Sequence, residues 1–115
     1  MLSANGIVAV LDEHKAEDIT AMPVTEITSI TDHMIICTAR SQQHAKALAS
    51  HVSTYMKQAG FPPLGIEGLD GSGWILVDGG DAIVHIMLEE TRAFYSLEKM
   101  WAFSEEVRAN EHDEA

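Results

Sequence analysis

The segment at residues 70–87, DGSGWILVDGGDAIVHIM, carries the side chains whose types and spacing could do chemistry. Two short apolar runs meet at a Gly-Gly pair, which favours a tight turn, so the segment predicts a β-hairpin. Asp78 and Asp81 flank the turn, and His85 follows in the second strand. Carboxylates could hold Mg²⁺ together with the phosphates of a nucleotide, and an imidazole could move a proton.

The spacing of the two acids speaks against such a metal site. Side chains on one face of a strand are two residues apart, whereas Asp78 and Asp81 are three apart across a turn and need not converge. The chain has no GxxxxGK[ST] loop for phosphates, and Asp and Gly are common turn residues in any protein. A metal-dependent, nucleotidyltransferase-like enzyme using Asp78, Asp81 and His85 is therefore the alternative hypothesis.

The six histidines and the single cysteine give no second site. His44 and His51 are seven residues apart on a predicted helix, whereas a helical zinc pair is four apart, so we expect solvated side chains. Cys37 lies in an apolar run without a basic neighbour, which is typical of a small core residue rather than a nucleophile. The sequence predicts no catalytic residue, no metal and no cofactor.

Composition narrows the class of partner. The chain has 115 residues, enough for one domain with its own core, and a net charge of −11 from 18 acids and 7 bases. This charge argues against direct binding of nucleic acid and favours a basic protein partner. We expect a cytoplasmic protein, because the sequence shows no membrane-spanning run, no export signal and only one cysteine.

Periodicity and capping predict the order α-β-β-α-β-β-β-α, an α/β fold in which one mixed sheet is packed with helices. The expected helices are 4–15, 41–60 and 91–101, and the expected strands are 19–24, 33–39, 64–68, 73–79 and 82–88. Pro23 would confine the first strand to an edge of the sheet or end it. We predict a single domain at 1–103, followed by an acidic, disordered tail at 104–115.

The hairpin also predicts a two-sided sheet, because alternate residues of a strand share a side. The first face carries Trp74, Leu76, Asp78, Ile83, His85 and Met87, and the second carries Ile75, Val77, Val84, Ile86 and Leu88. The second set is uniformly apolar and predicts core. The first set is half polar, and tryptophan and methionine are enriched at protein interfaces, so it is a candidate binding surface. In the last helix, Phe94, Leu97 and Trp101 are expected to face the core, and Arg92, Tyr95 and Lys99 to face away.

Several blocks of this sequence resemble the ribosomal silencing factor family, RsfS, also called Iojap-like. The blocks are SITDHMIICT, PLGIEG, WILVDGGDAIVHIM and EETRAFYSLEKMW. They occur in the same order and at matching spacing, over about residues 7–101. The resemblance implies a topology related to nucleotidyltransferases without their catalytic residues, and hence a protein that is not an enzyme.

The resemblance also implies a partner and a mechanism. Members of the family bind a basic protein of the large ribosomal subunit, the fourteenth of its series, block the joining of the subunits and repress translation when nutrients are scarce. In the family, the hairpin aromatic and the tyrosine of the last helix contact that protein, and these match Trp74 and Tyr95. Free members can also be homodimers. Pattern and resemblance together predict the partner-binding residues Trp74, Leu76, Asp78, His85, Met87 and Tyr95.

Overall fold

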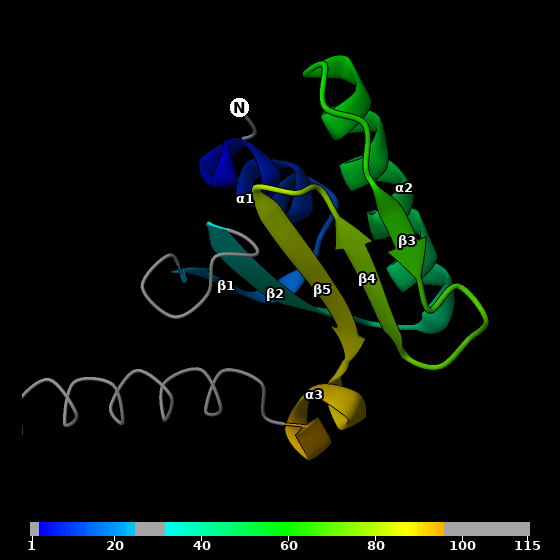
Figure 1. Cartoon of the computed structure of the whole chain (residues 1–115). Coiled ribbons are helices and arrows are strands. Elements are labelled where there is room, and N and C mark those ends of the chain that lie inside the picture. Colours follow the sequence, from blue (N-terminus) through cyan, green and yellow to red (C-terminus); the bar gives the residue numbers. More distant parts are fainter. Residues whose placement is uncertain (1–2, 25–31, 96–115) are drawn as a thin grey trace, which may run out of the picture.

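The elements follow the predicted order along the chain (Figure 1). The structure is a computed structural model that describes residues 3–24 and 32–95. Its helices and strands are α1 (Ala4–Glu13), β1 (Glu17–Pro23), β2 (His33–Ala39), α2 (Gln42–Gln58), β3 (Gly65–Glu67), β4 (Trp74–Asp78), β5 (Ala82–Leu88) and α3 (Glu89–Tyr95). The predicted tail at 104–115 lies outside the described residues. No helix in the described part of the chain is long and apolar enough to cross a membrane.

The strands form a five-stranded mixed sheet in the order β1-β2-β5-β4-β3. The central strands β2 and β5 pair in parallel, whereas the other neighbours pair antiparallel. Pro23 lies in the edge strand β1, as the sequence predicted, because an edge strand does not need the backbone N–H that proline lacks. Residues 34–39 of β2 are all buried, so this strand is covered on both faces.

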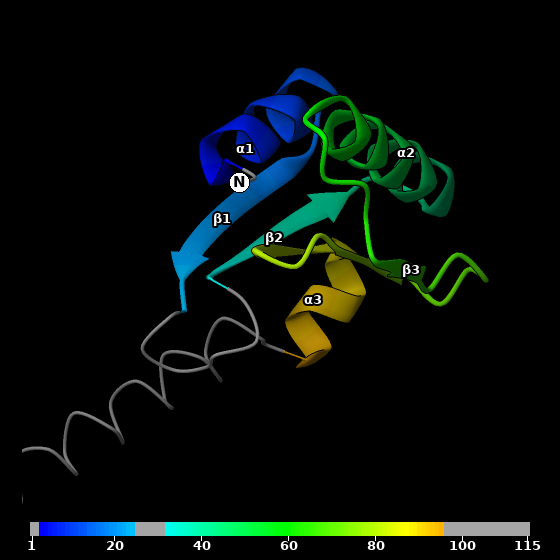
Figure 2. The same ribbon diagram turned by 45° about the horizontal axis from the view of Figure 1, so that its top comes forward.

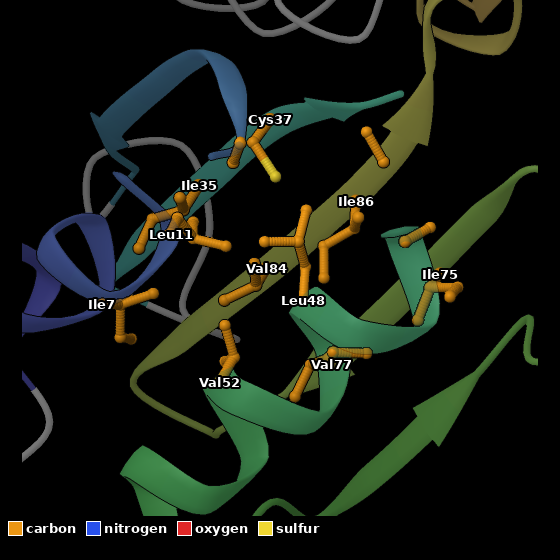
Figure 3. Close-up of a cluster of buried hydrophobic side chains, with 14 of the residues drawn as sticks. Ile7, Leu11, Ile35, Cys37, Leu48, Val52, Ile75, Val77, Val84 and Ile86 are labelled. Atoms are coloured by element: carbon orange, nitrogen blue, oxygen red, sulfur yellow. The ribbon is translucent and has the colours of Figure 1, made fainter. Parts of the chain in front are cut away.

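Helices α1 and α2 cover one face of the sheet, and α3 lies on the other (Figure 2). The side chains between α1, α2 and the sheet form the main core, in which Leu48 and Val52 of α2 meet Val84 and Ile86 of β5 (Figure 3). Ile75 and Val77 of β4 join this core, which confirms the prediction for the second face of the hairpin.

A glycine inside α1 lets the two helices pack closely. A side chain at Gly6 would collide with the hydroxyl of Tyr55 in α2, because a Cβ built there lies 1.9 Å from that oxygen. Glycine costs helix stability relative to alanine, but here it makes room for Tyr55. The Ser3 hydroxyl caps the helix by accepting the N–H of Gly6 at 3.1 Å.

Three histidines join the end of α1 to α2; His51 is exposed, as the sequence predicted for a helix histidine, whereas His44 is half-buried. The rings of His14 and His51 stack with centroids 3.5 Å apart. The His44 ring accepts the N–H of Arg40 at Nδ1, and its Nε2 therefore carries the proton that it donates to the carbonyl of His14 at 2.9 Å. The spacing of His44 and His51 within α2 could not predict this cluster, because its third member, His14, lies at the end of α1.

Helix α3 is turned differently from the prediction. Phe94 is 81% exposed, so it does not belong to the core. Arg92 instead points to the sheet, where its guanidinium donates to the backbone oxygen of Asp18 and to the hydroxyls of Thr20 and Thr38. These polar contacts attach the helix to β1 and β2. Leu97, Lys99 and Trp101 lie outside the described residues.

Candidate functional site

The register of the sheet places all the predicted hairpin residues of the first face side by side. Trp74 pairs with Met87, Leu76 with His85, and Asp78 with Ile83. The same register extends this side across β3, where Glu67 pairs with Leu76, and across β2, where Thr38 pairs with Met87. We call this side of β3, β4 and β5, opposite α1 and α2, the docking face.

Trp74 and His85 form the polar centre of the docking face. The indole Nε1–H of Trp74 donates to Nδ1 of His85 at 3.0 Å, and the two rings are tilted by 46°. His85 is only 6% exposed, and burial lowers the pKa of its imidazole to about 4, from an ordinary value of 6.5. The imidazole is therefore neutral near pH 7 and fixes the orientation of the tryptophan ring.

Met87 lies deeper than the sequence predicted. It is fully buried in a second apolar cluster with Val24, Met34 and Ile36, on which Trp74 also packs. The prediction of a half-polar surface was thus wrong for Met87 and His85, because β5 is a central strand whose side chains are covered on both faces. Both residues support the docking face from beneath, whereas Trp74 and Leu76 remain partly exposed.

A hollow of about 410 Å³ opens beside Trp74. It is lined by Glu67 and Gly68 at the end of β3, Ser72 in the following loop, Trp74 and Leu76 in β4, and Thr91 in α3. The walls are thus an aromatic ring, an aliphatic side chain, two hydroxyls and one exposed carboxylate. Glu67 and Thr91 were missed by the sequence analysis. Alternation in β3 signals that Glu67 shares a side with Leu76, once the pairing of β3 with β4 is known.

The carboxylate of Asp78 stabilises the turn of the hairpin. The Asp78 carboxylate accepts the N–H of Gly80 at 2.9 Å, and Gly80 has φ +83°, a conformation that glycine adopts readily. The backbone oxygen of Asp81 accepts the N–H groups of Asp32 and His33. Within the described residues, no group of three or more His, Cys, Asp or Glu side chains could hold a metal ion. This geometry gives no support to the alternative metal-dependent enzyme.

Cys37 is a core residue, as the sequence predicted. It is fully buried in the main core, and burial raises the pKa of its thiol to about 12. A thiol that stays protonated near pH 7 is a poor nucleophile.

Tyr95 is the last described residue of α3, and its side chain lies outside what the structure describes. The helix nevertheless borders the docking face, because Thr91 lines the hollow together with Trp74. Its contribution to a binding surface stays a prediction.

Comparison with known proteins identifies the family. A family model described as "Ribosomal silencing factor during starvation" matches residues 2–115. The chain belongs to the ribosomal silencing factor family. The matched range extends past Trp101, where the resemblance seen in the sequence blocks ended. Membership supports a role in ribosome silencing and translation regulation, and it favours a regulatory function over a catalytic one.

Individual members of the ribosomal silencing factor family match most of the chain. The ribosomal silencing factor of Haemophilus influenzae is 48% identical over 92 residues, which cover 80% of this chain and 90% of that protein. The ribosomal silencing factor of Bacillus subtilis is 34% identical over 93 residues, covering 81% and 79% of the two chains. A crystal structure of a Chromobacterium violaceum protein superposes with a TM-score of 0.83 at 35% identity, covering 86% of this chain and 82% of that one.

The pairing of His85 with Trp74 predicts an acid-dependent loss of stability. In the unfolded chain this imidazole titrates near pH 6.5, and in the folded chain its pKa is about 4. Between these values the unfolded state binds the extra proton, so the free energy of unfolding falls as the pH falls. The stabilisation is complete above pH 6.5 and is lost as the pH drops towards 4. Urea unfolding should show a loss of about 2 kcal/mol from this residue between about pH 7.5 and about pH 5.

The matched control is His85→Gln, whose amide oxygen can still accept the indole N–H but does not titrate. Wild type should lose about 2 kcal/mol more than this variant over the same pH interval. Equal losses in the two proteins would contradict the assignment of a buried, neutral imidazole.

Proposed function

We propose that the docking face binds a basic protein of the large ribosomal subunit, the fourteenth of its series, and that the bound molecule blocks joining of the small subunit. Translation is thereby repressed when nutrients are scarce. The protein acts in the cytoplasm, and its mechanism requires affinity and bulk rather than a chemical step. A homodimer of the free protein stays a prediction.

The observation that supports this proposal most is the fixed tryptophan beside an open hollow. Trp74 is held by its hydrogen bond to His85 and by packing on the second apolar cluster. A rigid, partly exposed aromatic loses little conformational freedom on binding, and such residues are enriched among those that contribute most to interface affinity. The hollow at its side offers room for a side chain of the partner.

Charge supports the choice of a basic partner. The chain carries a net charge of −11, and the exposed carboxylate of Glu67 lines the hollow next to Trp74 and Leu76. A lysine or arginine side chain could lay its apolar stem along Leu76, place its cation over the aromatic ring and pair with Glu67. Complementary charge of this kind speeds association and orients the partner.

Truncation of the two predicted aromatic contacts should weaken binding while the main core between α1, α2 and the sheet remains. Trp74→Ala and Tyr95→Ala should each weaken binding to purified large subunits by about thirtyfold or more, because buried aromatic anchors typically contribute about 2 kcal/mol. Co-sedimentation with purified large subunits measures the affinity, and circular dichroism verifies that each variant is folded at the temperature used.

The control lies one residue along the same strand. Ile75→Ala should lower the free energy of unfolding by about 2–4 kcal/mol through a cavity in the main core, yet bind as wild type while folded. Loss of binding in Ile75→Ala together with retention of binding in Trp74→Ala would show that the partner uses the opposite face.

A charge reversal in the hollow should weaken binding in a salt-dependent way. Glu67→Lys should lower the affinity for large subunits about tenfold at low salt, and the deficit should shrink at high salt as the charges are screened. The matched control is Glu13→Lys at the exposed end of α1, which makes the same change in net charge on the opposite side of the sheet. Equal effects of the two replacements would assign the attraction to overall charge and not to the hollow.

A further inference from the structure

The contacts of Arg92 join three separate elements. Its Nη1 donates to the backbone oxygen of Asp18 and, at 3.0 Å, to the hydroxyl of Thr38, and its Nη2 donates at 3.2 Å to the hydroxyl of Thr20. One guanidinium in α3 thus binds both β1 and β2. The planar fork of arginine, with its five donors, suits such a divided set of acceptors, whereas the single ammonium of lysine does not.

One of the two acceptors in β1, the backbone oxygen of Asp18, lies at an irregularity of that strand. The pairing of β1 with β2 shifts register between Glu17 and Thr20, and Asp18 has φ +47°. A bulge of this kind interrupts the ladder and re-aims the backbone, and a positive φ is uncommon in a residue other than glycine. Here the irregular backbone turns the carbonyl of Asp18 toward the guanidinium of Arg92.

The acceptors lie on the side of the sheet that carries the docking face. Thr20 pairs with Ile36, which pairs with His85, so Thr20 stands in the same row as His85 and Leu76. Thr38 pairs with Met87, which pairs with Trp74. The neighbour of Arg92, Thr91, lines the hollow. The contact that fastens α3 is therefore continuous with the surface that Trp74 occupies.

We propose that Arg92 is a positioning residue for partner binding: by holding the β1 bulge and Thr38, it fixes α3 at the edge of the docking face. The inference rests on the proposed function, because it assigns Arg92 a role in forming that surface. Arg92 acts through the helix, so that the wall of the hollow at Thr91 and the position of Tyr95 are set before the partner arrives.

Arg92→Met tests the proposal, since methionine keeps an unbranched, apolar stem and removes all three hydrogen bonds. Hydrogen exchange of the amides at 90–95 should become at least tenfold faster, while the amides of β2 and β5 keep their protection. The affinity for purified large subunits should fall about tenfold. Unchanged exchange in α3, or equal loss of protection in the central strands, would overturn the positioning role.

Two further variants separate positioning from direct contact. Thr20→Val with Thr38→Val removes two acceptors in residues of nearly the same shape and should reproduce most of the loss of affinity. In the Arg92→Met background the same pair should have little added effect, because the attachment is already broken. If the threonine pair binds as wild type while Arg92→Met does not, Arg92 contacts the partner directly and the proposal is wrong.

Arg92→Lys keeps the positive charge without the fork, and it should also weaken binding. Full affinity in this variant would show that charge alone suffices, against the proposal. Failure of the wild-type protein to sediment with large subunits would instead contradict the proposed function. The exchange measurement on the free protein would still decide how α3 is held.

Discussion

The central strands β2 and β5 impose the constraint on which the rest of the structure depends, because both faces of this parallel pair must be shielded from water. Helices α1 and α2 cover one face, where the main core forms. Among the described residues, cover on the other face comes from Val24, Trp74 and α3, which leaves a hollow over β3 and β4. The sheet thus has one face covered by α1 and α2 and one face that is only partly covered, and a partner could cover the open part of the second face.

Shielding a strand that contains a histidine requires a hydrogen-bond partner as well as bulk. Trp74 supplies both, since its ring packs on the apolar cluster and its N–H reaches His85. Within the described residues, no buried side-chain nitrogen or oxygen is left without a partner. The same bond that satisfies the buried imidazole orients the tryptophan, so the stability of this face and its readiness to bind share one interaction. Arg92 plays a comparable part for α3, because its guanidinium binds polar acceptors in β1 and β2.

The order of the elements and the two faces of the hairpin could be predicted, because strand alternation and helix capping are local properties of the sequence. The depth of Met87 and His85 could not, since it depends on which strands become central. The orientation of α3 was mispredicted because the apolar stripe through Phe94 suggested a core-facing side, whereas Phe94 is exposed. Arg92 instead binds the backbone oxygen of Asp18 in β1, a contact between residues 74 positions apart that local patterns cannot reveal. The histidine cluster was missed because its contacts also join residues far apart in the sequence: His14 at the end of α1 stacks on His51 of α2.

The central claim, that the Trp74 side of the sheet meets the large subunit, can be tested by hydroxyl-radical footprinting of the protein alone and bound to purified large subunits. Oxidation of Trp74 and Leu76 should fall strongly on binding. Oxidation of His51 on α2 and Phe61 just beyond it, which are exposed on the far side, should stay unchanged. Protection of His51 and Phe61 with undiminished oxidation of Trp74 would contradict the account.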